Sequence, residues 1–196
     1  TGTAAIIGGG VIGGGWAARF LLNGWDVVVH DPAPGAAETL AGVLDRARAS
    51  LPALYDVALP PEGGLRMADS VEDAVAAADW VQESVPERLD VKHEVLARID
   101  AATAPDAVIA SSTSGFKPSE LTAMGARCIV AHPFNPVYLL PLVELVGAAE
   151  TGARAAEMLR GIGMFPLILR REIDAHIGGR FLEAVWREAL WLVKRG

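Results

Sequence analysis

The sequence TAAIIGGGVIG, residues 3–13, passes from a continuous apolar segment into a cluster of glycines. The apolar part predicts a buried strand, and the residues after the glycines predict a helix. Between them, Gly8, Gly10 and Gly13 have the spacing G-x-G-x-x-G. In such a turn the first glycine permits a tight bend, the second lets a ligand approach the backbone, and the third lets the helix pack on the strand. A start of this kind is typical of a doubly wound α/β sheet.

Short apolar runs alternate with amphipathic segments along the rest of the chain. The runs are continuous, which favours buried parallel strands, and the alternation of strand and helix favours a Rossmann-type doubly wound, mostly parallel sheet. The predicted parallel strands are residues 3–8, 26–31, 80–83, 107–110 and 128–132, and the predicted helices are residues 11–23, 35–50, 71–78, 88–101 and 119–123. Further along we expect a strand at 139–146, a helix at 151–160 and a strand at 164–169.

The last segment differs from the rest. Apolar residues recur there at helical spacing up to the end of the chain: Ile177, Phe181, Val185 and Leu192. Such a helix is too apolar to stand alone in water, so we expect it to pack against a second domain, another subunit or both. We divide the chain into a Rossmann domain, residues 1–172, and the first helix of an incomplete all-α domain, residues 173–196. Thr1 in place of a methionine, and a helical pattern that runs to the last residue, indicate part of a longer chain.

Composition excludes several classes of protein. Hydrophobic residues make up 52% of the 196 and charged residues 21%, which predicts a packed core. A formal charge of -7, with no basic cluster larger than a pair such as Arg170-Arg171, argues against a nucleic-acid partner. The lone Cys128 lies in an apolar run and is expected to be a buried structural thiol. No segment is long or apolar enough to predict a membrane span or a signal peptide, so we expect a cytoplasmic protein, and we assign no metal ligands.

The glycine spacing predicts a dinucleotide site. A pyrophosphate would lie on the N-terminus of the following helix, where N–H groups and the helix dipole favour anions. The second predicted strand ends in Asp31, eighteen residues after Gly13. An acid there accepts hydrogen bonds from the ribose hydroxyls and repels a 2′-phosphate, which favours NAD over NADP. The alternative is a purely structural glycine turn followed by an unrelated aspartate. The residues expected at the cofactor are Gly8, Gly10, Val11, Ile12, Gly13 and Asp31.

A histidine and a glutamate twelve residues apart are the candidates for catalysis. His132 begins the segment HPFNP and falls at the carboxyl end of a predicted parallel strand, the edge where open α/β sheets bind ligands. Its ordinary pKa suits a general base near neutrality, and Glu144 can orient the imidazole and stabilise its protonated form. The alternative is a structural histidine at a strand end. His30, His93 and His176 are poorer candidates from their positions in the sequence.

Polar side chains follow the neighbouring strand as well. Residues 111–114, with the sequence SSTS, should reach the same edge of the sheet as His132. Ser114 and Asn135 can bind the substrate oxygen as it becomes a carbonyl. The alternative is that the serines only cap the helix predicted at residues 119–123.

Together these residues resemble the 3-hydroxyacyl-CoA dehydrogenase family over essentially the whole chain. The motifs that carry the resemblance are the glycine loop, Asp31, the S-x-T-S segment ending in Ser114, the H-x-F-N-P segment from His132, and Glu144. The resemblance implies that His132 is the base, that Glu144 is its partner and that Ser114 contacts both substrate and cofactor. It also implies that Glu87 and Lys92, five residues apart, contact NAD together with Asn135.

Within the family, the details resemble the members that oxidise carnitine rather than an acyl-CoA thioester such as 3-hydroxybutyryl-CoA; members that oxidise L-gulonate share several of them. Tyr138, Trp186 and Trp191 are aromatic residues that could contact a quaternary ammonium group. For either tryptophan alone, a packing residue on an interface helix is the better interpretation. One feature departs from the family, because Gly179 stands where many relatives have a substrate-binding asparagine. The substrate oxygen would then have one polar partner fewer.

The resemblance implies a helical second domain that closes the substrate cleft and forms a homodimer. We therefore expect NAD-dependent oxidation of a 3-hydroxy acid by the complete protein, and cofactor binding with little catalysis by residues 1–196 alone. An NAD-binding structural or sensory relative without turnover is the alternative from another class.

Overall fold

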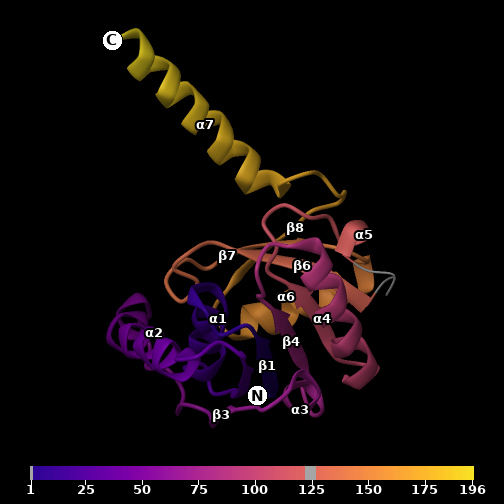
Figure 1. Ribbon diagram of the computed structural model, residues 1–196. Helices are drawn as coiled ribbons and strands as arrows, with labels where there is room; N and C mark the ends of the chain where they lie inside the picture. The colour runs from indigo at the N-terminus through magenta and orange to yellow at the C-terminus, as the bar shows by residue number, and fades with distance from the viewer. Residues whose placement is uncertain (1, 122–126) are drawn as a thin grey trace.

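The computed structural model describes residues 2–121 and 127–196. In these residues eight strands form one sheet, in the order β3-β2-β1-β4-β5-β6-β7-β8 (Figure 1). The strands are β1 (Thr3–Ile7), β2 (Asp26–His30), β3 (Leu65–Met67), β4 (Trp80–Glu83), β5 (Val108–Ser111), β6 (Cys128–Pro133), β7 (Leu142–Val146) and β8 (Phe165–Ile168). Strands β1 to β6 are parallel, β7 runs antiparallel to β6, and β8 is parallel to β7. The mostly parallel Rossmann-type fold predicted from the sequence is confirmed.

Helices cover both faces of this sheet. They are α1 (Val11–Leu21), α2 (Ala36–Ser50), the short 3-10 helix η1 (Leu51–Leu54), α3 (Val71–Val75), α4 (Leu89–Ala102), α5 (Pro118–Leu121), α6 (Ala149–Gly161) and α7 (His176–Arg195). Helices α1, α2 and α6 contribute to the core on one face, where the rings of Trp16, Phe20 and Trp80 pack together. Helices α3, α4 and α5 contribute to the core on the other face, which includes Cys128. Burial raises the pKa of the Cys128 thiol to about 12, as expected of a structural cysteine.

Several predicted elements differ at their ends from those in the structure. The edge strand β3 was not predicted, because its three residues are all exposed and are too few for their alternation to indicate a strand. The strand predicted at 139–146 begins only at Leu142, since the N–H groups of Leu139 and Leu140 both donate to the Pro136 carbonyl in a turn. The helix predicted at 71–78 ends at Val75. Of the helix predicted at 119–123, residues 122 and 123 lie outside the described residues.

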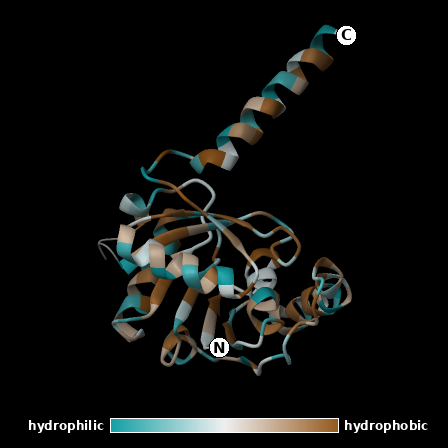
Figure 2. Ribbon diagram, turned by 180° about the vertical axis from the view of Figure 1, so that it is seen from behind, coloured by the Kyte–Doolittle hydropathy of each residue, from teal (hydrophilic) through white to brown (hydrophobic). Residues whose placement is uncertain are grey.

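The last helix leaves the body of the molecule. Helix α7 starts beside β7 and projects away from the sheet (Figure 1). Hydrophobic segments recur along its length although it stands clear of the rest of the chain (Figure 2). Phe181, Val185 and Trp186 are all more than 60% exposed. The apolar residues of α7 are therefore without a covering element in the part of the chain that the structure describes, and the expected partner of this helix stays a prediction. Within the part of the chain that the structure describes, no helix is long and apolar enough to cross a membrane.

Candidate active site

Two adjoining pockets open at the carboxyl edge of the parallel strands. The larger has a volume of about 590 Å³ and the smaller about 290 Å³, and both are lined by Ser84 and Val85. The larger pocket lies against the glycine loop and Asp31, and the smaller lies against His132. The sheet thus brings the predicted cofactor residues and the predicted base to one edge, as expected for an open α/β sheet.

The glycine loop has the geometry of a phosphate cradle. Gly8 has φ +94°, in the left-handed region, and a Cβ on Gly13 would lie 1.7 Å from the Gly8 carbonyl oxygen. A Cβ on Gly10 would have no protein atom within 4 Å, and this residue lines the larger pocket. No side chain caps α1, and its first turn holds no acidic residue. Two glycines are therefore needed for the turn and the packing, whereas Gly10 leaves room and N–H groups for an anionic cofactor.

Asp31 follows β2 and has two tasks. It lines the larger pocket, and its predicted contact with the ribose stays a prediction. Its Oδ2 also accepts a hydrogen bond of 2.7 Å from the Gly9 N–H, and its Oδ1 accepts one of 2.9 Å from the Ala33 N–H. The sequence pattern did not reveal this second task, in which Asp31 ties the glycine loop to the end of β2.

The other two predicted cofactor residues lie at the start of α1. Val11 is exposed, while Ile12 lines the smaller pocket.

His132 and Glu144 form the predicted pair. The antiparallel register of β6 and β7 places the two residues directly opposite each other. His132 Nδ1 lies 3.0 Å from Glu144 Oε2. Because a carboxylate only accepts hydrogen bonds, Nδ1 carries the proton, and Nε2 is left unprotonated in the neutral ring. His132 lines the smaller pocket together with Ser114, so the base and the serine expected at the substrate share one cavity.

Glu144 is also bound from the other side. Its side chain is only 1% exposed, and its Oε1 accepts hydrogen bonds of 2.8 Å from the N–H groups of Ile177 and Gly178. These two residues lie in the first turn of α7. Both carboxylate oxygens are therefore engaged, which offsets the cost of burying the charge.

Glu87 and Lys92 lie in the smaller pocket but belong to a wider network. The Lys92 ammonium is buried and donates to both oxygens of Glu83, at 2.8 and 3.1 Å, and it lies 3.3 Å from a Glu87 oxygen. Glu83, the last residue of β4, was not predicted to take part. The signal was available, since an acid at the end of an otherwise buried parallel strand requires a partner.

Glu87 holds the serine loop in place. Its Oε1 accepts hydrogen bonds from the Thr113 hydroxyl at 2.5 Å and from the N–H groups of Ser114 and Gly115 at 3.1 Å each. Burial raises the pKa of Glu87, but the Thr113 hydroxyl, Lys92 and the Gly115 N–H together lower it by more, so the net shift is downward. The serine segment is thus fixed against β4 and the loop after it. It does not cap α5, which begins at Pro118.

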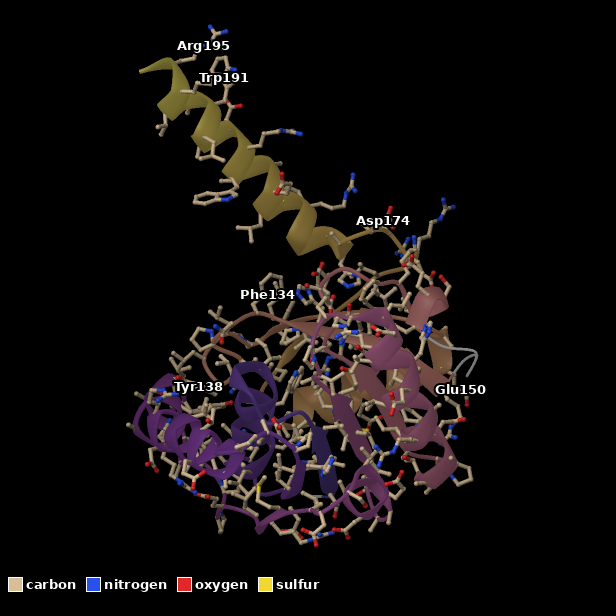
Figure 3. The ribbon with its side chains drawn as sticks, in the orientation of Figure 1. Phe134, Tyr138, Glu150, Asp174, Trp191 and Arg195 are labelled. Atoms are coloured by element: carbon tan, nitrogen blue, oxygen red, sulfur yellow. The ribbon has the colours of Figure 1, made fainter. Side chains whose placement is uncertain are left out.

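Four of the predicted substrate residues line neither of the two pockets. Asn135 is exposed and lines neither pocket. Tyr138 is partly buried and packs against the core on the α1 and α2 face (labelled in Figure 3). Trp186 is 63% exposed on α7, and Trp191 lies toward the far end of the same helix (Figure 3). Phe134, by contrast, lies just below the start of α7, and its ring packs against that of His132.

His176, judged a poor candidate from the sequence, is a neighbour of His132. It is fully buried at the start of α7, with its ring centroid 5.3 Å from that of His132. Its Nε2 donates to the Thr113 carbonyl at 3.2 Å, and no hydrogen-bond partner is found for its buried Nδ1. Burial lowers the pKa of His176, and the bond to Thr113 offsets this only in part. His176 therefore stays neutral in the folded chain at neutral pH.

This buried histidine makes an acid-sensitive contribution to stability. Because its pKa is lowered on folding, the unfolded chain takes up the proton first as the pH falls below about 6.5, and stability drops. Between about pH 7.5 and about pH 5.5 the parent is expected to lose about 1 kcal/mol more unfolding free energy than His176→Phe. Urea unfolding of both proteins at the two pH values measures the difference. An equal pH dependence in the two proteins would show that His176 is not buried in its neutral form.

The fold and the site together define a dinucleotide-binding α/β domain with a histidine–carboxylate pair at its ligand edge. The model of the 3-hydroxyacyl-CoA dehydrogenase NAD-binding domain matches residues 3–172. The chain belongs to the 3-hydroxyacyl-CoA dehydrogenase family, and NAD is the cofactor of the matched domain. Across the described residues there is no group of three or more histidine, cysteine or acidic side chains placed to hold a metal ion.

Individual proteins that are similar to this chain support the assignment to this family. The chain is 62% identical to an L-carnitine dehydrogenase/betainyl-CoA thioesterase of Ruegeria pomeroyi, over 99% of the chain and 41% of that protein. It is 53% identical to an L-carnitine dehydrogenase of Mesorhizobium japonicum, over 98% of the chain and 55% of that protein. The crystal structure of an NAD-dependent 5-formyl-3-hydroxy-2-methylpyridine 4-carboxylic acid 5-dehydrogenase superposes with a TM-score of 0.91 at 36% identity, over 99% of this chain and 65% of that one. The chain thus spans only about half the length of the curated relatives it matches.

Proposed function

We propose that the chain is the NAD-binding part of an L-carnitine 3-dehydrogenase, which oxidises the 3-hydroxy group of L-carnitine to give 3-dehydrocarnitine. The observation that carries the proposal is the hydrogen bond of 3.0 Å between His132 and Glu144, beside a pocket that Ser114 also lines. The identity of 62% and 53% to two proteins named as L-carnitine dehydrogenases supports the choice of substrate.

In this proposal His132 is the general base. Its Nδ1–H is held by Glu144, so Nε2 is the nitrogen that accepts the proton of the substrate hydroxyl. Glu144 stabilises the imidazolium that results, because its charge lies directly against the protonated ring. Ser114 binds the substrate oxygen as it becomes a carbonyl, and Asn135 is its proposed second partner. The nicotinamide, when bound, supplies the acceptor for the hydride that leaves C3.

The surrounding network keeps these groups in position. Glu87 fixes the loop that carries Ser114. The buried pair of Lys92 and Glu83 fixes the end of β5 just before that loop, because the Ser111 hydroxyl donates to Glu83. Positioning of this kind is a large part of the rate enhancement when two groups act on one substrate atom. Glu87 and Lys92 are thus proposed to serve the cofactor through the shape of the smaller pocket, which they both line.

Helix α7 is the part of the chain that is proposed to connect to the rest of the complete protein. We propose that residues 173–196 open a helical domain that closes the cleft and forms a homodimer in the cytoplasm. The exposed apolar residues of α7 favour such a partner, since they leave a long unpaired surface. The aromatic residues Tyr138, Trp186 and Trp191 are candidates for cation–π contact with the trimethylammonium group in that closed state.

A substrate panel tests this proposal in the complete protein. NADH formation is measured with L-carnitine, L-gulonate and 3-hydroxybutyryl-CoA at matched concentrations. L-carnitine is expected to give the highest kcat/KM. A higher kcat/KM for the thioester or for gulonate would refute the substrate and leave the chemistry standing. NAD binding without turnover of any of the three would favour a structural or sensory relative instead.

A further inference from the structure

The first turn of α7 is bonded to the carboxylate that orients the base. Glu144 Oε1 accepts from the Ile177 and Gly178 N–H groups at 2.8 Å each, while Oε2 lies 3.0 Å from His132 Nδ1. The N-terminus of a helix carries a partial positive charge, which complements a buried carboxylate. The carboxylate therefore bridges the base on β6 and a helix that otherwise stands clear of the sheet (Figure 3).

Gly178 makes this close approach possible. A Cβ on this residue would lie 2.4 Å from Phe134 Cζ and 3.1 Å from Glu144 Oε2, the oxygen that bonds His132. The Phe134 ring in turn packs against His132, with centroids 5.2 Å apart, so a shift of Phe134 changes the contact with His132. Any side chain at this position would push on the base, on its carboxylate, or on both. At the next residue, Gly179, a Cβ would meet only the Ala175 Cβ, at 3.4 Å.

The same turn is fastened to the loop that carries Ser114. His176 donates to the Thr113 carbonyl, and Asp174, just before the helix, accepts a hydrogen bond of 2.6 Å from the Lys117 ammonium. The start of α7 is therefore held on both sides of the smaller pocket, by the base and its carboxylate and by the serine loop. Movement of α7 as a rigid element would therefore disturb both the His132–Glu144 pair and the loop that carries Ser114.

We propose that Gly178 is a positioning residue, and that the first turn of α7 completes the His132–Glu144 pair. The orientation of α7, and so of whatever packs on it, is then coupled to the orientation of the base. The inference rests on the proposed function only where that function names His132 as the base. The hydrogen bonds themselves are open to measurement without turnover.

The first test compares Gly178→Ala with Gly152→Ala. Both residues lie in the first turn or just after it in an α-helix, and a Cβ on Gly152 would have no neighbour within 4 Å. In the complete protein, Gly178→Ala is expected to lower kcat about tenfold to a hundredfold with unchanged NAD affinity, because the base is displaced. Gly152→Ala is expected to keep the parent kcat. A Gly178→Ala protein with the parent kcat would overturn the proposal.

An NMR signal reports on the same bond without catalysis. In the 196-residue chain, the proton on His132 Nδ1 is expected to give a slowly exchanging, low-field resonance because Glu144 holds it. Gly178→Ala is expected to broaden or shift this resonance, whereas Gly179→Ala, which stiffens the same helix without a close contact, is expected to leave it in place. If the two substitutions changed the resonance equally, Gly178 would have no special effect on the His132–Glu144 hydrogen bond, and the proposal would be contradicted.

A third measurement covers the case in which Gly178→Ala does not fold. Glu144→Gln adds no bulk, but it replaces the charged carboxylate that accepts hydrogen bonds from the N–H groups of α7 with a neutral amide. Amide hydrogen exchange at Ile177 and Gly178 is expected to accelerate about tenfold, with Glu157→Gln, an exposed change on α6, as the control. Unchanged protection in Glu144→Gln would overturn the proposal. If the complete protein does not oxidise carnitine, the proposed function fails, while the resonance and the exchange rates still decide this inference.

Discussion

Replacement of His132 by alanine is expected to lower kcat for L-carnitine oxidation on the order of a thousandfold in the complete protein. A general base contributes about 10²- to 10⁴-fold to such a reaction, and no other side chain in the smaller pocket has an unprotonated nitrogen held for the task. NAD affinity is expected to change much less than kcat, because the glycine loop and Asp31 lie at the larger pocket, which His132 does not line. Initial rates of NADH formation, with NAD affinity measured separately, give the two quantities.

The matched control is His93→Ala. His93 is an exposed histidine on α4 whose Nε2 lies 2.7 Å from the Glu120 carbonyl, and it lines neither pocket. Its replacement is expected to leave kcat within about twofold of the parent, in line with the small effect of most surface substitutions. A His132→Ala protein that retained near-parental kcat would mean that another group takes the proton.

Gly13→Ala is expected to abolish measurable NAD binding and to destabilise the fold by about 3 kcal/mol or more. The added methyl would lie 1.7 Å from the Gly8 carbonyl oxygen, so α1 and the turn before it have to separate. That movement removes both the packing of α1 on β1 and the path of the glycine loop. Urea unfolding and calorimetric titration with NAD measure the two effects.

Gly10→Ala separates the cofactor from the fold. Its methyl would meet no protein atom within 4 Å and would stand in the larger pocket. Stability is expected to stay within about 1 kcal/mol of the parent, the usual cost of alanine at a helix N-cap. NAD affinity is expected to fall about tenfold or more, because the methyl occupies the space for the pyrophosphate. Parental NAD affinity in Gly10→Ala would show that the cofactor does not approach this loop.

The sequence alone was enough for the fold and for the main polar groups of the site. The continuous apolar runs identify the buried parallel strands, since both faces of such strands are covered by helices. The glycine spacing and Asp31 lie within one local strand–turn–helix–strand unit, so local pattern is sufficient there. His132 and Glu144 were paired by their spacing, and the antiparallel register of β6 and β7 explains why twelve residues suffice.

Contacts between distant parts of the chain could not be predicted in this way. The Glu83–Lys92 pair, the hold of Glu87 on the serine loop and the burial of His176 each depend on which elements become neighbours. The three-residue strand β3 was missed because three residues are too few to show the alternation of a strand. Tyr138 was singled out as an aromatic residue that could contact a quaternary ammonium group, and its packing against the core on the α1 and α2 face could not be predicted from that pattern.

Transfer of deuterium from L-carnitine labelled at C3 is the most direct test of the central proposal. The complete protein is incubated with NAD and the labelled substrate, and the NADH is analysed by mass spectrometry. The proposal predicts singly deuterated NADH from the parent, and almost none from His132→Ala. Formation of unlabelled NADH, or no NADH at all while NAD binds, would contradict the assignment of this site to the 3-hydroxy group of L-carnitine.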